Sequence, residues 1–358
     1  MTRALVFSDH DFTAHRARFS DGDASAPLPY GIDILEGQGF TLAGVPQASR
    51  PWTVKLRDVV EHRLGFPLEP ALRGITQSGR PDVVIALLER QAATASYLKS
   101  ARVPPYSNTA LVNWSCWLAD DIQRADTAER ARLVRRYKSA DLITHLSRHE
   151  TEILVDAGFR EEQLFPITYG VCHRYYTPPE TPRDIDILAV GQDRGRDYKT
   201  LFDAVRGTDL RVDVVCRPEN VAGLSVPDNV RMHGVVPLGG YRDLLRRARI
   251  VAIPTGVHAY PTGSSVALES ASSGCCVVTT STPAMRDYFT DNDADDDTAI
   301  LLPPHDSSSW RECLLRLRDD EPTTKRLGDN ARRSVESRFN ADHMWTEFAS
   351  ELRARQLC

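Results

Sequence analysis

Hydrophobic and polar positions along the chain predict short buried strands that alternate with amphipathic helices. Short runs rich in apolar residues, typical of buried strands, occur at Ala4–Ser8, Val83–Leu88, Ile185–Val190 and Cys276–Thr280, and the run Val83–Leu88 is apolar throughout. Between such runs, apolar residues recur at helical spacing, as they do over Tyr241–Arg249. Strands that alternate with helices favour the α/β fold class with parallel sheets.

Weaker patterns occur in the first half of the chain. Gly31–Leu35 and Phe40–Leu42 are typical of short strands, and Trp52–Leu64 places its apolar residues on one side of a helix. A change of composition comes at Tyr175–Arg183, which holds three prolines in nine residues and is typical of a linker. With 358 residues, the chain is long enough for a domain on each side of this linker.

Composition argues against several classes of protein. Hydrophobic residues make up 41% of the chain, enough for a sizeable core, and the net charge of −5 argues against a duplex-binding protein. The sequence has no apolar run of eighteen residues and no secretory signal, and its seven cysteines form no C-x-x-C pair. We therefore expect a reduced, cytoplasmic protein with no transmembrane segment and no nucleic-acid partner.

Two charged stretches have plain interpretations. The helix expected over Thr127–Ala140 is rich in arginine, which favours a solvated face over peripheral contact with anionic lipid. The acidic run Asp291–Asp297 begins like a calcium-binding loop, but Asp296 stands where glycine is needed and Leu302 where the last acidic ligand is needed. We therefore predict no metal site in this protein.

A helix start in the second half has the outline of a phosphate site. The helix is predicted to begin at Ser264 or Ser265, directly after Gly263. The first amides of a helix have no internal partner and lie at the positive end of its dipole, and a serine hydroxyl there can cap the helix or donate to an anion. Glu269 lies about one turn further along the helix. The alternative is an ordinary capped crossover helix.

Polar residues follow two predicted strands in the first half. His10 and His15 come after the first strand, and Glu89 follows Val83–Leu88. Ligands gather where the strands of an open α/β sheet end, so these side chains are candidates for acid–base or acceptor-binding roles. The alternative is that they are ordinary loop and core residues.

Two tryptophans, Trp114 and Trp117, lie at the end of a further strand that is predicted to begin at Ala110. Paired indole rings can form a platform for a sugar ring or an apolar acceptor. Such residues are more often partly buried packing. The sequence leaves both interpretations open.

A series of motifs occurs in order in the second half of the chain: ILAVGQDRGRDYKTL, VRMHGVVP, ARIVAIPT, TGSSVALESASSGCCVVTTSTPAMRDYF and LLPPHD. Their order and spacing over Ile185–Phe339 resemble the donor domain of retaining glycosyltransferases of the GT-B fold, family four. The first half resembles the acceptor domain more loosely, chiefly through ADLITHLSRHETEILVDAGFREEQLFPITYGVCHRYYTP.

The resemblance implies two Rossmann-like parallel-sheet domains that face each other across a cleft, with C-terminal helices crossing back to the first domain. Residues 1–176 would form an N-terminal acceptor-binding domain and residues 177–183 the linker. Residues 184–338 would form the domain that binds the nucleotide-sugar donor, and residues 339–358 a helix that packs on the first domain.

In that family, an arginine and a lysine after the first strand of the donor domain hold the diphosphate. Arg194 or Arg196 and Lys199 stand there in this sequence. A planar guanidinium and a compact ammonium both suit phosphate oxygens, so the resemblance implies that they stabilise the leaving group and that catalysis needs no metal ion.

Further donor contacts are implied by the same resemblance. Glu269 would contact the ribose, and Val235, in the loop Gly234–Pro237, would border the base. The distal phosphate would meet the backbone amides of Gly263, Ser264 and Ser265.

Some positions depart from the family's pattern. Pro261 stands where a glutamate usually contacts the sugar, so that His258 or Tyr260 would fill the space, and His173 replaces a common aspartate. HDFTAHRARF replaces the usual glycine-rich loop after the first strand. The roles proposed in the first half therefore rest on the residues alone: positioning for His10, and acceptor binding for His15, Glu89, Trp114 and Trp117.

The resulting interpretation is a hexosyltransferase-type glycosyltransferase. It would move a sugar from a UDP- or GDP-linked donor to a natural product or glycan, with retention at the anomeric carbon and no cofactor. Domain closure would exclude water from the reaction. The alternatives are a GT-B phosphorylase or epimerase, and a catalytically inactive partner protein.

Overall fold

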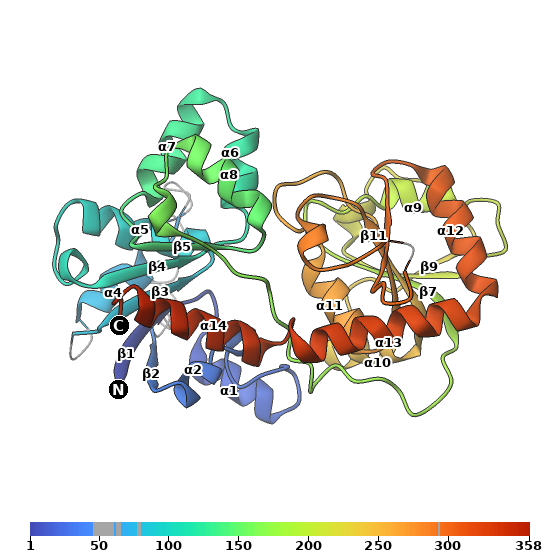
Figure 1. Ribbon diagram of the computed structural model, residues 1–358, viewed down its shortest axis with the longest axis horizontal. Helices are drawn as coiled ribbons and strands as arrows, with labels where there is room; N and C mark the ends of the chain where they lie inside the picture. Colours follow the sequence, from blue (N-terminus) through green and yellow to red (C-terminus); the bar gives the residue numbers. More distant parts are fainter. Residues whose placement is uncertain (46–60, 62–65, 77–79, 293) are drawn as a thin grey trace. The chain divides into compact units, whose positions relative to one another are not determined.

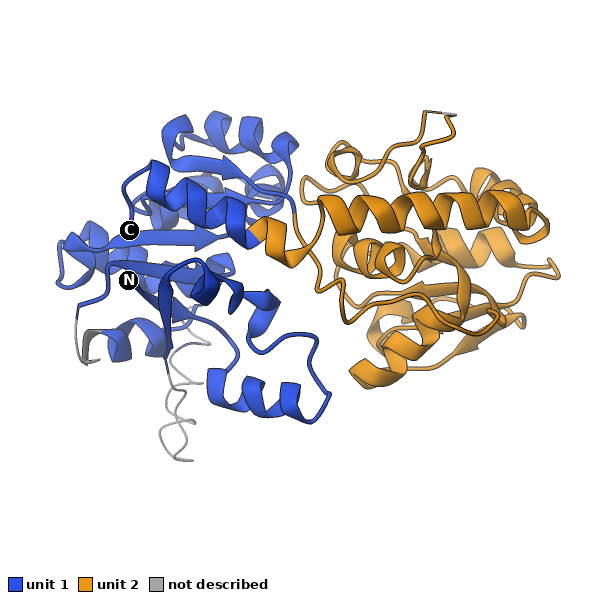
Figure 2. Cartoon of the chain, turned by 60° about the horizontal axis from the view of Figure 1, so that its bottom comes forward, with its two compact units in different colours: residues 1–168, 345–358 blue, residues 169–344 orange. Residues whose placement is uncertain are grey.

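The computed structural model describes residues 1–45, 61, 66–76, 80–292 and 294–358. They form two compact units, of which unit 1 comprises Met1–Thr168 and Trp345–Cys358, and unit 2 comprises Tyr169–Met344 (Figure 2). Each unit contains a six-stranded sheet whose strand pairings are parallel. The predicted α/β class, with two Rossmann-like sheets, is confirmed.

Unit 1 is built on a sheet of order β2-β1-β3-β4-β5-β6 (Figure 1). Every position of β3 is buried, as expected of a central strand covered on both faces. The strands are β1 (Thr2–Phe7), β2 (Phe40–Gly44), β3 (Val83–Leu87), β4 (Ala110–Trp114), β5 (Leu142–His145) and β6 (Leu164–Pro166). The helices are α1 (Phe12–Ser20), α2 (Ile34–Gly37), α4 (Glu69–Thr76), α5 (Glu89–Ser100), α6 (Leu118–Arg124), α7 (Thr127–Tyr137) and α8 (Arg148–Ala157).

One predicted strand of unit 1 is wrong. Gly31–Leu35 lies in a 3-10 turn followed by α2, because Tyr30 and Gly31 adopt positive φ angles of 57° and 71° that no strand contains. Ile32 and Leu35, three residues apart, are both fully buried, which is a helical spacing. The helix predicted over 52–64 lies, apart from Glu61, outside the described residues.

Unit 2 has a sheet of order β12-β11-β10-β7-β8-β9. Its strands are β7 (Ile185–Val190), β8 (Val212–Val215), β9 (Val230–Met232), β10 (Ala248–Ile253), β11 (Cys276–Thr280) and β12 (Ile300–Leu302). Its helices are α9 (Tyr198–Val205), α10 (Leu238–Arg247), α11 (Ser264–Ser272), α12 (Ser307–Asp319) and α13 (Glu321–Ser337).

Two hydrophobic cores cover the two faces of this sheet. Alternate residues of β7 point to opposite cores: Ile187 packs with α9 and α12, whereas Leu188 packs with α10, α11 and α13. Burial on both faces explains why most residues of β7, β10 and β11 are apolar. The loops at the carboxyl ends of β7 and β10 then meet at one edge of the sheet, because the two strands pair in parallel.

The chain crosses between the units twice. The first crossing falls between Thr168 and Tyr169, earlier than the predicted boundary after residue 176, because the segment that follows packs on unit 2. The amide of Tyr169 donates to Tyr288 Oη at 2.9 Å, and Tyr176 is buried in a core of unit 2. The second crossing lies in α14 (Ala341–Ala354), whose residues from Trp345 onward belong to unit 1 (Figure 2). The predicted return of the C-terminal helix to the first domain is thus confirmed.

In the part of the chain that the structure describes, no helix combines the length and the apolar character needed to cross a membrane. The same residues contain no cluster of three or more His, Cys, Asp or Glu side chains that could hold a metal ion.

Candidate functional site

Helix α11 begins with a backbone geometry that leaves donors exposed to a ligand. Gly263 is its N-cap residue, with a left-handed φ of 86°, and no side chain caps the helix. The amide of Ser264 donates to the carbonyl of Pro261 at 3.0 Å, and the predicted contacts of the Gly263, Ser264 and Ser265 amides with a phosphate stay predictions. The amide of Ala267 donates to the carbonyl of Gly263 at 2.9 Å, and the first-turn amides of Ser265 and Val266 precede that bond, where an anion can accept from them.

A buried arginine lies against this helix start. The side chain of Arg196, in the loop after β7, is only 4% exposed, and its Nε donates to Asp193 Oδ2 at 2.8 Å. A Cβ atom on Gly263 would lie 2.9 Å from Arg196 Nη1, and one on Gly191 would collide with Arg196 Nε. The guanidinium therefore occupies space that two glycines leave free. We call Arg196, Gly263 and the first turn of α11 the α11 site.

One nitrogen of that guanidinium has no hydrogen-bond partner among the residues that the structure describes. This atom, Arg196 Nη1, is buried and finds no acceptor there. An unmet donor on a buried cation is costly, since burial removes its water without replacement. Together with the first-turn amides of α11, it forms a set of donors that an anion of phosphate geometry would complete.

The carboxyl group of Glu269 borders the same site. Its Oε2 accepts a hydrogen bond from Tyr241 Oη at 2.6 Å, and the hydroxyl of Tyr176 also bonds to it. Burial raises the pKa of Glu269 from its ordinary value of 4.5 to about 7, against the opposing effects of the two phenols and the positive charge of Arg196. Glu269 is thus an acceptor that changes its charge near neutral pH.

The loops after β7 and β10 are held together beneath the site. Gly256 donates its amide to the carbonyl of Gly195 at 2.9 Å. The ring of His258 packs on Gly195, where a Cβ atom would lie 2.9 Å from its Nε2. His258 is buried and Tyr260 is partly buried, and the predicted contact of either with a sugar stays a prediction.

Three of the predicted donor residues are exposed. Lys199, on α9, is 71% exposed, and its Nζ pairs with Asp203 Oδ2 at 2.5 Å. Arg194 is exposed as well, whereas Arg196 is the arginine placed at the helix start. Val235, predicted to border the base, is 60% exposed in the loop after β9. A phosphate role for Lys199 would require its ammonium to exchange Asp203 for the ligand.

In unit 1, the ends of neighbouring strands bring some predicted residues together. The rings of His10 and His15 lie 5.7 Å apart, and burial, with the nearby charges of His10 and Arg18, lowers the pKa of His15. Glu89 lies at the end of β3. Its Oε2 accepts hydrogen bonds from the amides of Cys116 at 3.0 Å and Trp117 at 3.4 Å, which follow the end of β4. Glu89 therefore orders the loop before α6, and its predicted acceptor role stays a prediction.

Trp114 is part of the core of unit 1. It is 1% exposed, and its ring lies 5.2 Å from that of Tyr30 and 6.2 Å from that of Trp345. A ring enclosed in this way offers no open face to an acceptor, so the structure favours packing over the predicted platform. Trp117 is partly buried.

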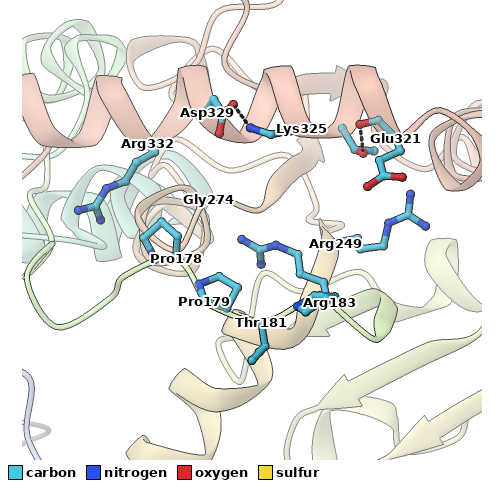
Figure 3. Close-up of a pocket in the computed structure, with 12 residues that line it drawn as sticks. Pro178, Pro179, Thr181, Arg183, Arg249, Gly274, Glu321, Lys325, Asp329 and Arg332 are labelled. Carbon is cyan, nitrogen blue, oxygen red and sulfur yellow. Dashed lines mark hydrogen bonds and ion pairs between the residues drawn. The ribbon is translucent and has the colours of Figure 1, made fainter.

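A hollow of about 510 Å³ lies at the other end of α11, next to Gly274 (Figure 3). Two of its cations, Arg183 and Lys325, are engaged with the protein itself. Arg183 donates to the carbonyls of Ala248 and Ser273, each at 2.6 Å, and Lys325 pairs with Asp329 at 2.6 Å. The proline-rich segment 177–183 is thereby fastened to unit 2, which gives this hollow a structural explanation.

The sequence did not single out Gly191, Tyr241, Tyr176 or Arg183. The contacts that these four residues make form only when the chain folds. In the sequence, both tyrosines look like ordinary apolar positions. The glycine that directly follows β7 is the one local signal, because glycine there permits close approach of a side chain.

Two parallel-sheet units, with an anion-ready helix start in the second, place the protein among the GT-B glycosyltransferase folds. Residues 219–334 match the family described as glycosyl transferases group 1, which confirms the predicted resemblance to glycosyltransferases of the GT-B fold. Over 47 residues the chain is 40% identical to O-antigen chain mannosyltransferase C of Escherichia coli. That match spans 13% of this chain and 13% of the mannosyltransferase.

Solved structures of the same fold cover almost the whole chain. HepE of Anabaena, in complex with UDP-glucose, has a TM-score of 0.70 and 13% identity over 99% of this chain and 100% of its own. Sucrose-phosphate synthase from Thermosynechococcus elongatus has a TM-score of 0.71 and 15% identity over 99% of both chains. At these identities the likeness shows the fold.

Proposed function

We propose that the protein is a glycosyltransferase that takes a sugar from a nucleotide-diphosphate donor and transfers it with retention at the anomeric carbon. The observation that carries this proposal is the buried Arg196, whose unpartnered Nη1 lies at the start of α11. The family match over 219–334 and the UDP-glucose bound to HepE support a nucleotide sugar as the ligand.

Each group of the α11 site has a role in this proposal. As the bond between sugar and phosphate breaks, negative charge grows on the leaving diphosphate. Arg196 and the amides of Ser265 and Val266 stabilise that charge, with Lys199 as a second cation, so no metal ion is needed. Glu269 accepts the ribose hydroxyls. The leaving phosphate takes the acceptor's proton on the same face of the sugar.

The finer assignments extend the proposal to unit 1 and to the cell. We propose a hexosyl donor linked to UDP or GDP, and a natural product or glycan as acceptor. The acceptor would meet His15, Glu89 and Trp117, with His10 positioning it. We place the protein in the cytoplasm, where such donors occur and its free thiols stay reduced.

Nucleotide binding provides the first test. UDP or GDP at about 100 times its Kd should stabilise the protein by about 2.7 kcal/mol, which raises Tm by several degrees. Arg196→Ala should abolish that rise. Arg211→Ala, which removes an exposed arginine paired with Asp186, is the matched control and should preserve it. A normal rise in Arg196→Ala would exclude the α11 site as the phosphate site.

One observation favours a second candidate, a nucleotide-binding partner without activity. Pro261, which is buried, stands where the family's glutamate contacts the sugar. Nucleotide release from a panel of UDP- and GDP-sugars separates the candidates. Binding without release favours the inactive partner, and release that depends on inorganic phosphate favours a phosphorylase.

A further inference from the structure

Two tyrosines from distant parts of unit 2 hold the carboxyl group of Glu269. Tyr241 comes from α10 and donates to Glu269 Oε2 at 2.6 Å. Tyr176 comes from the segment before β7 and bonds to the same carboxyl group. Tyr176 is buried in the core and Tyr241 packs against it, with ring centroids 6.2 Å apart in an edge-to-face arrangement. The carboxyl group is thus approached from two sides.

The backbone of Tyr176 is fixed independently of Glu269. Its carbonyl accepts hydrogen bonds from Ser272 Oγ at 2.7 Å and from Arg332 Nη1 at 2.8 Å. The rings of Tyr175 and Tyr176 meet at right angles, with centroids 5.0 Å apart. A phenol carries a single proton, so each tyrosine that donates it to the carboxyl group favours the ionised acceptor. The orientation of Glu269 is therefore imposed by its surroundings.

We propose that Tyr241 and Tyr176 are positioning residues that keep the Glu269 carboxylate ionised and aimed at the ribose of a bound nucleotide. This inference rests on the proposed function, because it takes the α11 site as the nucleotide site. Ribose hydroxyls are donors, and a carboxylate accepts from them, whereas a protonated carboxyl group presents a competing donor.

The balance of charges around Glu269 makes the role of the phenols measurable. Burial favours the protonated form, and three surrounding groups oppose it: Tyr241 from α10, Tyr176 from the segment before β7, and Arg196 from the loop after β7. Since the pKa of Glu269 lies at about 7, removing one phenol hydroxyl moves the titration upward through neutral pH.

Calorimetric titration with UDP between about pH 6 and pH 8.5 tests the proposal, with Glu269→Gln as the reference that cancels the titration of UDP itself. Relative to that reference, wild-type affinity should fall as the pH drops through about 7, by up to tenfold per pH unit. In Tyr241→Phe and Tyr176→Phe, the midpoint of that fall should lie at higher pH. At pH 7 each variant should bind UDP about tenfold more weakly, and part of the loss should return at pH 8.5.

Tyr288→Phe is the matched control, because it removes a buried hydroxyl of the same core that bonds to the amide of Tyr169 instead. The Tyr288→Phe variant should lose UDP affinity with the same midpoint pH as the wild type. The proposal would be overturned if UDP affinity depended on pH in the same way in Tyr241→Phe and in the wild type. It would also be overturned if Tyr288→Phe moved the midpoint pH as far as Tyr241→Phe does.

A readout without ligand separates this inference from the proposed function. A carboxyl group whose folded pKa lies above its ordinary 4.5 lowers stability as the pH rises from 4.5 to about 7, because the folded state binds the extra proton. Relative to Glu269→Gln, wild-type stability should decline over that window and then level off, and in Tyr241→Phe the decline should continue to higher pH. If UDP and GDP fail to bind but this displacement is seen, the proposed function fails and the control of Glu269 by the tyrosines stands.

Discussion

The chain forms α9, β8, β9, α10 and β10 between Arg196 and Gly263, yet a Cβ atom on Gly263 would lie 2.9 Å from Arg196 Nη1. The glycine is thus required both for the turn into α11 and for the room that the guanidinium occupies. An added methyl group would also lie 2.6 Å from Ile253 Cγ2.

Gly263→Ala should therefore weaken both stability and nucleotide binding. The φ of 86° costs a residue with a Cβ atom about 1–3 kcal/mol, and displacement of the guanidinium removes the diphosphate contact. Chemical denaturation and UDP titration measure the two effects. Gly256→Ala is the control, because its Cβ atom would meet its nearest neighbour, His258 Nε2, at an ordinary 3.4 Å. Equal behaviour of the two variants would contradict the interpretation.

Lys199→Ala should abolish the rise in Tm caused by UDP or GDP while changing the stability of the free protein by less than about 0.5 kcal/mol. The small stability effect follows because the pair with Asp203 is exposed. Asp203→Ala releases the ammonium and should preserve or enlarge the rise. A full response in Lys199→Ala would remove this lysine from the donor site.

Arg183→Ala should lower the free energy of unfolding by about 2–4 kcal/mol, because the carbonyls of Ala248 and Ser273 lose a charged donor. Lys325→Ala, at the same hollow (Figure 3), should cost less than about 0.5 kcal/mol. Urea denaturation compares them. Equal losses in the free energy of unfolding would mean that Arg183 is not the residue that holds segment 177–183 on unit 2.

Trp114→Ala should destabilise the protein by about 3–5 kcal/mol, since the indole is fully buried between Tyr30 and Trp345. Trp117→Ala, at a partly buried position, should cost clearly less. The same denaturation measurement serves both variants. A small effect of Trp114→Ala would revive a surface role for this ring.

Features that depend on neighbours in sequence could be predicted, and features that depend on distant contacts could not. The start of α11 was predictable because glycine followed by serine is a local signal for the beginning of a helix. The burial of Arg196 was not, because it depends on Gly191 and Gly263 together. The strand predicted at Gly31–Leu35 failed because apolar residues in a short run suit a helical turn equally well.

The two tryptophans illustrate the same limit from another side. Aromatic residues at the end of a strand give the same sequence pattern whether their rings pack in the core or bind a ligand. For Trp114 the outcome was decided by Trp345, which the chain supplies only after passing through the whole of unit 2. Tyr241 was missed for a similar reason, since its partner Glu269 comes from another helix.

The enclosure of Arg196 also bears on how tightly a ligand can be held. An exposed arginine surrenders about 1.5–2 kcal/mol of rotamer freedom when it grips a phosphate, and it must shed its water at the same moment. Here the fold itself encloses the guanidinium, whose side chain is 4% exposed and whose Nε is held by Asp193. The guanidinium is therefore preorganised for a diphosphate. Less free energy is lost to ordering the side chain on binding, so more of the electrostatic attraction contributes to affinity.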